Sequence, residues 1–146
     1  MNIQIAYPYV LLIAVNHNNH VLLLRRNEHA PFGACHYSLV GGKVEDTESY
    51  RQALIREARE EVGIVIEEKD LSFSSIIHAY RPHERIVLAT FTVKVWRNNP
   101  LNCEPHKHDA LLWAPLQRLP DPLLPLNRLA LELFTHNTPY AEVNWA

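Results

Sequence analysis

One segment restricts the fold of this chain more than any other, namely residues 39–64, LVGGKVEDTESYRQALIREAREEVGI. Within it, Leu54, Ala58 and Val62 recur every four residues, which is the spacing of the buried stripe of an amphipathic helix. Gly63 follows the last of them, and glycine commonly ends a helix because it adopts the left-handed conformation without strain. The segment therefore predicts one amphipathic helix that ends at Gly63.

Polar residues mark the start of this helix. Asp46 or Thr47 is expected to cap it, because the side-chain oxygens of these residue types accept hydrogen bonds from the first free amides. Glu48 is then expected in the first turn, where the helix dipole favours a negative charge. Just upstream, residues 37–40 predict a short strand that ends at Gly41-Gly42.

Further strands are predicted on both sides of the helix. Apolar and β-branched runs typical of strands lie at residues 3–15, 20–26, 71–80, 86–96 and 110–116. The first two runs flank an Asn-rich turn, NHNN, which predicts a hairpin. In the fourth run, Phe91, Val93 and Val95 are expected to share one face of the strand.

The order of these elements predicts the fold class. The run at residues 110–116 is expected to be the last strand, and residues 125–134 to form a closing helix. Strands interleaved with two helices are typical of an α/β layered domain with a mixed sheet. With 146 residues and no internal repeat, the chain is expected to form a single domain over residues 1–146.

Composition and charge exclude several classes of protein. The net charge of −2 argues against a general binder of polymeric nucleic acid, which needs a basic surface. No apolar run approaches the length of about 18 residues that a transmembrane helix needs, so no membrane association is expected. The two cysteines, Cys35 and Cys103, provide no disulfide framework, and the reducing cytoplasm is the expected location.

Three glutamates of the helix call for a chemical explanation. With a rotation of about 100° per residue, Glu57 and Glu61 lie about 40° apart and Glu60 about 60° from Glu57 on the other side. Carboxylates so close repel one another, and Mg²⁺, which prefers oxygen ligands, would remove that repulsion. Gly41-Gly42 can turn a bare carbonyl toward the same point, and Arg56 can orient a neighbouring carboxylate. The alternative is a solvated acidic helix face with no ligand.

The spacing of residues around these glutamates favours the metal site. The chain has Gly42, then Glu48, then the run Arg56-Glu57-Ala58-Arg59-Glu60-Glu61 and finally Gly63-Ile64. This pattern resembles the Nudix box of the MutT-like pyrophosphohydrolases at every fixed position. The order of strands around it also resembles the Nudix fold, an α/β/α sandwich with a mixed β-sheet.

The resemblance implies an activity. Family members use Mg²⁺, sometimes Mn²⁺, to hydrolyse a nucleoside diphosphate linked to another group. By position in the motif, Glu57 and Glu61 are expected to be direct metal ligands, with Glu60 direct or through water, and one of the acids to serve as base. The Gly41 carbonyl resembles the backbone ligand of the family, and Arg56 is expected to hold Glu57. Glu48 lies too far around the helix for the metal face, so a structural bond to the loop or to Arg56 is expected.

Further site residues are implied outside the box. Arg25 and Arg26 resemble the basic residues of the family's second strand that meet substrate phosphates, although a solvated strand end is the alternative. Glu104, in NCEPHKHD, resembles the acid that the family places outside the box as a metal ligand or base, or it is a plain loop residue. Asn127 lies where MutT-like triphosphatases place an asparagine that binds the purine. His106 and His108 share the loop of Glu104, and such an alternate pair can bind a soft metal, but with neither cysteine in a ligand-like spacing we expect both to be solvated.

These inferences lead to one principal function and two alternatives. The principal hypothesis is a (deoxy)nucleoside triphosphate pyrophosphohydrolase, acting on standard, oxidised or other non-standard nucleotides and releasing a monophosphate and pyrophosphate. The first alternative is another Nudix substrate, namely ADP-ribose, a diadenosine polyphosphate or a nucleoside diphosphate sugar. Against ADP-ribose, Pro82 comes a few residues later than the proline that ADP-ribose pyrophosphatases carry after the box. Tyr80 resembles a tyrosine of the diadenosine polyphosphate hydrolases. The second is a Nudix module that binds a nucleotide without hydrolysis, against which the intact box argues. By resemblance alone, a homodimer is compatible with all three.

Overall fold

The computed structural model describes residues 3–145 and contains eight strands, two α-helices and one short 3₁₀ helix in this part of the chain. The strands are β1 (Ala6–Ala14), β2 (His20–Arg26), β3 (Tyr37–Ser38), β4 (Val40–Lys43), β5 (Ser72–Arg81), β6 (Glu84–Val93), β7 (His108–Pro115) and β8 (Tyr140–Val143). The helices are α1 (Tyr50–Val62), η1 (Glu68–Asp70) and α2 (Pro125–Thr135). No helix in the described range is long and apolar enough to span a membrane.

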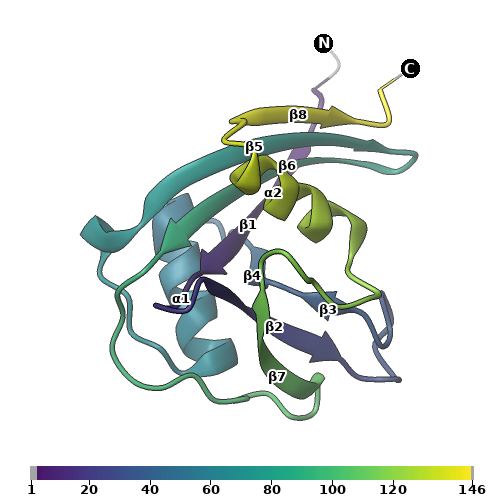
Figure 1. The fold of residues 1–146 in the computed structure, drawn as a ribbon. Helices are drawn as coiled ribbons and strands as arrows, with labels where there is room; N and C mark the ends of the chain where they lie inside the picture. Colours follow the sequence, from purple (N-terminus) through teal and green to yellow (C-terminus); the bar gives the residue numbers. More distant parts are fainter. Residues whose placement is uncertain (1–2, 146) are drawn as a thin grey trace.

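The strands form two sheets, as Figure 1 shows. The larger sheet has the order β4-β1-β6-β5-β8, in which β1 runs parallel to β6 and antiparallel to β4, and β8 runs parallel to β5. The smaller sheet has the order β3-β2-β7 and is antiparallel. The larger sheet is therefore mixed, which confirms the expected α/β architecture.

The two helices cover opposite faces of β1. Val10 and Leu12 of this strand belong to one buried cluster, which contains Leu54, Ala58 and Val62 of α1. Leu11 and Ile13 belong to a second buried cluster, which contains residues of α2 such as Leu131. Because successive side chains of a strand point to opposite faces, a continuous apolar run such as YVLLIAV serves both cores. The result is the layered sandwich that the resemblance implied.

The expected pairing of the first two strands is wrong. The turn between them forms, with the amide of Asn16 donating to the carbonyl of His20 at 3.0 Å. Beyond it, only the isolated bridge between Val15 and Val21 joins the two strands. Both edges of β1 are occupied by β4 and β6, so β2 continues into the smaller sheet and pairs with β7.

Two further expectations about strands need correction. The strand from residue 86 onward ends at Val93, and Val95 is 63% exposed. Thr90 is as fully buried as its apolar neighbours, because β6 lies in the middle of the larger sheet between β1 and β5. The strand β7 is not the last one, since the short strand β8 follows α2 and extends the larger sheet.

Helix α1 ends as expected and begins later than expected. Gly63 adopts the left-handed conformation with φ 72°, and its amide donates to the carbonyl of Arg59. The cap is Ser49, not Asp46 or Thr47, because Ser49 and Gln52 form a reciprocal capping box. Glu48 therefore precedes the helix, where its side chain is free to turn back toward the helix surface.

Candidate active site

Helix α1 packs against the glycines of strand β4. The expected short strand does not end at Gly41-Gly42, because β4 continues through both residues and pairs with β1. A Cβ atom at Gly42 would lie 2.5 Å from Oε1 of Glu57, so only glycine leaves room for this carboxylate. The glycine pair thus lets the acidic face of the helix approach the strand backbone.

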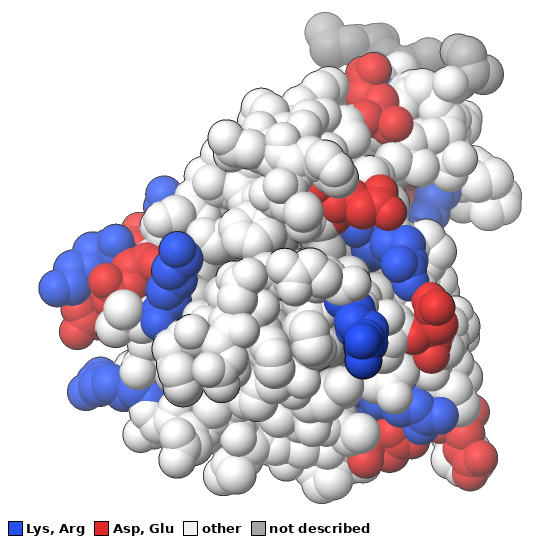
Figure 2. All heavy atoms as spheres, viewed as in Figure 1, with Lys and Arg blue, Asp and Glu red and all other residues white. Residues whose placement is uncertain are grey.

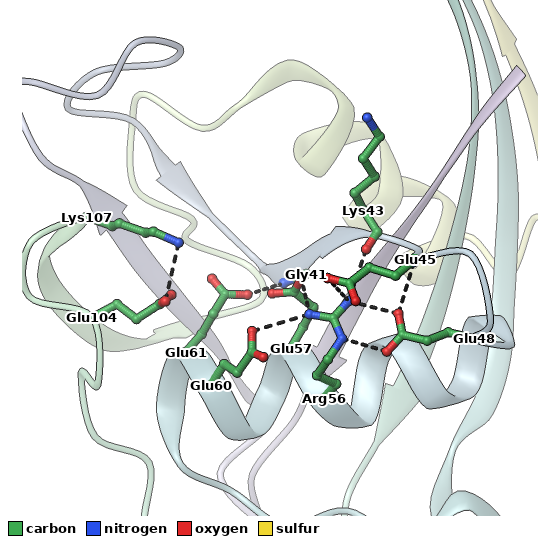
Figure 3. Close-up of polar contacts among 10 residues, drawn as sticks. All are labelled: Gly41, Lys43, Glu45, Glu48, Arg56, Glu57, Glu60, Glu61, Glu104 and Lys107. Atoms are coloured by element: carbon green, nitrogen blue, oxygen red, sulfur yellow. Dashed lines mark hydrogen bonds and ion pairs between the residues drawn. The ribbon is translucent and has the colours of Figure 1, made fainter.

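Glu61 is the most deeply buried acid of the helix. Its side chain lies against β4, where the amide of Gly41 donates to Oε1 at 2.9 Å, and the residue is only 7% exposed (Figure 3). Burial raises the pKa of Glu61 well above its ordinary value, and the Gly41 hydrogen bond opposes that rise. The proximity of Glu57 and Glu104 adds to the rise. The structure therefore holds an acid in a place where its negative charge needs a partner.

Arg56 organises the acids around it. Its Nε donates to Oε2 of Glu48 at 2.6 Å, and its Nη2 donates to Oε1 of the same carboxylate at 2.9 Å. Its Nη1 donates to Glu57 at 3.0 Å and to Glu60 at 3.3 Å, and Figure 3 shows these bonds radiating from one guanidinium group. The bond from Arg56 lowers the pKa of Glu48, and the pKa of Arg56 is raised in turn. The expected contacts of Arg56 with Glu57 and of Glu48 with Arg56 are both present.

Glu57 and Glu60 differ in their surroundings. The side chain of Glu57 is 16% exposed and that of Glu60 is 52% exposed. Burial raises the pKa of Glu57, and the hydrogen bond from Arg56 acts against this rise. The carboxylate of Glu57 lines a cavity, whereas Glu60 lines neither of the two cavities described below. The metal-binding role of Glu60 stays a prediction.

The loop before β7 brings a second set of groups to Glu61. The amide of Cys103 donates to the carbonyl of Glu61, and the amide of His108 donates to the carbonyl of Glu104, each at 3.0 Å. Donor atoms of Glu61, Glu104 and His108 lie within 4.8 Å of one another. The carboxylate of Glu104 also forms an ion pair with Lys107 at 3.3 Å, which Figure 3 shows.

His108 contradicts the expectation of a solvated loop histidine. It is 4% exposed, and its Nε2 lies 3.9 Å from Oε2 of Glu61. Burial lowers the pKa of His108, with a further contribution from the positive charge of Arg26, so the neutral imidazole is favoured. The residue is buried because it is the first residue of β7 and not part of the preceding turn.

Two adjoining cavities meet at this acidic cluster. The larger has a volume of about 730 Å³ and the smaller about 420 Å³. Five residues line both cavities, namely Arg26, Gly41, Gly42, Glu61 and His108. The smaller cavity also contains Glu57, Glu104 and Lys107, whereas the larger is mainly apolar and includes Ile86, Leu88 and Leu126. A volume of a few hundred Å³ is typical of small-molecule sites.

The predicted substrate-binding residues occupy different positions. Arg25 pairs with Asp109 at 2.5 Å and lines neither cavity, whereas Arg26 lines both. Asn127 lines the larger cavity, and its Oδ1 accepts the amide of Leu39 at 2.8 Å. This bond directs the Asn127 carbonyl to the backbone and leaves its amide nitrogen as the donor available to a ligand. The roles of all three residues in binding stay predictions.

Some residues of the larger cavity were not identified from the sequence. Phe32 is 53% exposed and lines the cavity, and the guanidinium groups of Arg26 and Arg81 lie 6.0 and 5.7 Å from its ring centre. Glu84 lines it too and pairs with Arg81 at 3.5 Å. These residues come from a loop and from the ends of β5 and β6, and no local pattern links them. Only His108 gave a signal in the sequence, because it lies four residues after Glu104 in the chain.

The arrangement fits a divalent cation. Within residues 3–145, no lysine or arginine forms an ion pair with the buried Glu61. Glu57, Glu61 and Glu104 supply carboxylate oxygens to one cavity, and oxygen is the donor that hard cations prefer. A cation there would compensate the charges that burial disfavours.

Comparisons with known proteins agree with this architecture. Residues 7–134 match the family model described as NUDIX domain. An 8-oxo-dGTP diphosphatase of Proteus vulgaris is 36% identical over 87 residues, which cover 60% of this chain and 74% of that protein. A CTP pyrophosphohydrolase of Escherichia coli (strain K12) is 34% identical over 102 residues, which cover 67% of this chain and 70% of that protein. The crystal structure of a MutT NUDIX hydrolase from Burkholderia pseudomallei matches with a TM-score of 0.79 and 30% identity, covering 89% of this chain and 98% of that one.

Proposed function

This chain belongs to the Nudix family of MutT-like hydrolases, and we propose that it cleaves a nucleoside triphosphate to the monophosphate and pyrophosphate in a Mg²⁺-dependent reaction. The observation that carries the proposal is the junction of the two cavities at Glu61. One side of the junction is acidic and suited to a cation with phosphates, and the other is apolar and suited to a nucleobase. A triphosphate nucleotide has these two parts at its two ends.

The metal would be held by the acids of the smaller cavity. Glu57, Glu61 and Glu104 are the proposed ligands, with the Gly41 carbonyl and Glu60 as the further ligands that the motif implies. When bound, Mg²⁺, or Mn²⁺ in its place, neutralises phosphate oxygens and lowers the pKa of a water molecule. Arg56 acts as a positioning residue, because its bonds fix Glu57 relative to Glu48.

The phosphates would lie between the acids and two basic side chains. Arg26 and Lys107 both line the smaller cavity, and each can neutralise phosphate oxygens. In hydrolysis, a water oxygen forms a new bond to phosphorus, the anhydride bond between the α and β phosphates breaks, and pyrophosphate leaves. A carboxylate of the smaller cavity, Glu57, Glu61 or Glu104, accepts the proton of the water.

The nucleobase of the substrate would occupy the larger cavity. Asn127 can donate a hydrogen bond from its amide nitrogen to a carbonyl or ring nitrogen of the base, while Phe32 and Leu126 provide apolar contact. The two curated relatives are named for a purine and a pyrimidine nucleotide, 8-oxo-dGTP and CTP. We propose a free nucleotide as substrate and not a polymeric nucleic acid, since Figure 2 shows positive and negative side chains interspersed on the face viewed.

Three further proposals concern the protein as a whole. We propose that one domain carries the activity, because the family model spans residues 7–134. We propose the cytoplasm as its location, because Cys35 and Cys103 are both free thiols. A homodimer stays a prediction from resemblance.

A substrate screen tests the proposed reaction. Purified protein with Mg²⁺ is incubated with standard and oxidised nucleoside triphosphates, ADP-ribose, diadenosine polyphosphates and nucleoside diphosphate sugars, and pyrophosphate and phosphate are measured separately. Release of pyrophosphate with a monophosphate left behind, lost with EDTA and restored with Mg²⁺, is the expected result. Turnover of ADP-ribose or a dinucleotide alone would refute the substrate class, and nucleotide binding without any turnover would refute the enzymatic function.

A further inference from the structure

His108 has surroundings that its role as a buried side chain does not explain. Buried polar groups in proteins are nearly always hydrogen bonded. The imidazole of His108 is 4% exposed, and its Nδ1 is buried with no hydrogen-bond partner among residues 3–145. The nearest acid, Glu61, is 3.9 Å from Nε2, which is too long for a hydrogen bond. A histidine retained only for packing would leave this polar ring unsatisfied.

The backbone of His108 is held by two hydrogen bonds. His108 begins β7, where its amide bonds the carbonyl of Glu104 and its carbonyl accepts the side chain of Asn102 at 2.8 Å. The bond to Glu104 joins His108 to a residue one turn away in the same loop. Glu61 comes from helix α1 and is anchored to Gly41. The three groups therefore approach one another from two rigid elements and a tight turn.

The spacing of the three groups suits a metal ion. Nitrogen and oxygen ligands lie about 2.0–2.2 Å from a transition metal, so two ligands on opposite sides of it are about 4.2 Å apart. The separation of 3.9 Å between Nε2 of His108 and Oε2 of Glu61 falls within this limit. The donor atoms of Glu61, Glu104 and His108 lie within 4.8 Å of one another, so the largest of their separations would shorten by less than about 1 Å around a metal ion. A cation between His108 and Glu61 would be a common partner for Nε2 of the imidazole and Oε2 of the carboxylate.

We propose that His108 is a direct nitrogen ligand of the metal site, together with Glu61 and Glu104, and that the site therefore binds Mn²⁺ in preference to Mg²⁺. Imidazole is a good ligand for first-row transition metals, whereas Mg²⁺ prefers oxygen donors and retains its waters. Lys107 pairs with Glu104 at 3.3 Å, and a bound cation would take its place there and leave its ammonium group, on a side chain 59% exposed, available to phosphate. This inference rests on the proposed function only for the location of the site.

The test uses the full-length, EDTA-treated protein and Mn²⁺ alone. Electron spin-echo spectroscopy of bound Mn²⁺ detects a directly bonded ¹⁴N nucleus, and labelling the histidines with ¹⁵N identifies the signal as imidazole. His108→Ala should abolish this signal and weaken Mn²⁺ affinity by at least about tenfold, with a smaller loss for Mg²⁺. The matched control is His106→Ala, two residues away in the same loop, whose contact with Asn27 is through its backbone carbonyl.

Each outcome decides the matter. A histidine ¹⁴N signal in the wild type and in His106→Ala, lost in His108→Ala, supports the proposal. Mn²⁺ bound without a nitrogen signal in the wild type overturns it, as does failure to bind Mn²⁺ at all, and neither result requires a variant that folds. Failure of the proposed function is separate, because it shows in the Mg²⁺ substrate screen. If the substrate screen shows turnover but the spectra show no nitrogen ligand, the enzymatic function stands and only the metal-binding role of His108 is refuted.

Discussion

Replacement of Arg56 by lysine tests whether one guanidinium group organises the acidic site. Arg56 donates to both oxygens of Glu48 at 2.6 and 2.9 Å, to Glu57 at 3.0 Å and to Glu60 at 3.3 Å. A lysine ammonium is compact and cannot bind Glu48 in a fork while also reaching Glu57. Arg56→Lys therefore keeps the charge and removes the geometry.

The expected loss of stability follows from these bonds. Hydrogen bonds to charged groups contribute about 1.5–3 kcal/mol each. The side chains of Arg56 and Glu48 are 23% and 15% exposed, so solvent weakens the pair, and lysine retains part of one contact. We expect Arg56→Lys to lower the free energy of unfolding by about 2 kcal/mol, equivalent to a fall in Tm of about 4–8 °C for a chain of this size.

The assay is urea and thermal unfolding of the metal-free protein, with Arg59→Lys as the matched control. Arg59 is on the same helix but exposed, and it forms no ion pair within residues 3–145. In the Mg²⁺ assay, Arg56→Lys should also lower kcat, with partial recovery at higher Mg²⁺, because Glu57 is no longer held in place. Equal stability and activity of Arg56→Lys and Arg59→Lys would refute the reasoning.

Three more predictions follow from the burial of the site. Glu61→Gln should reduce Mg²⁺-dependent turnover by about 100-fold or more. It should also raise the Tm of the metal-free protein at pH 8, because the glutamine amide keeps the hydrogen bond to Gly41 and removes a buried charge. A lower Tm would contradict this reasoning. The metal-free wild type should lose stability as the pH rises above 4.5, the ordinary pKa of glutamate, because burial raises the pKa of Glu57 and Glu61 in the folded state. The stabilising contribution of these two acids is complete below pH 4.5 and is lost as the pH rises through their raised pKa values. Measuring Tm from pH 4.5 to 8 with EDTA checks this slope, and Mg²⁺ should reverse it. Asn127→Asp should raise the KM for a nucleoside triphosphate about tenfold with a small change in Tm, because the aspartate keeps an acceptor for the Leu39 amide. Asn127→Leu should raise the KM as well and also lower the free energy of unfolding by about 1–3 kcal/mol. An unchanged KM in both variants would exclude Asn127 from nucleobase binding.

The local pattern of the sequence determined helix α1 and the chemistry it carries. The stripe of Leu54, Ala58 and Val62 is buried as predicted, and Gly63 ends the helix in the left-handed conformation. These features depend only on residues within a few turns of one another, where the 3.6-residue period restricts the geometry. The same period placed Glu57 and Glu61 on one side, and the spacing of the whole motif was sufficient to indicate the family.

Features that depend on distant residues were decided by the tertiary structure. A solvated acidic helix face was the alternative to a metal site, but the glycines of β4, about twenty positions earlier in the chain, allow Glu61 to be buried. His108 reaches Glu61 only because β7 pairs with β2, and β2 pairs there because both edges of β1 are already taken. The larger cavity joins Phe32, Asn127 and the end of β5 in the same way. Sequence periodicity predicts which face of a helix or strand is buried. The partners of a strand and the burial of a particular charged side chain depend instead on contacts between residues far apart in the chain, and these contacts exist only in the folded protein.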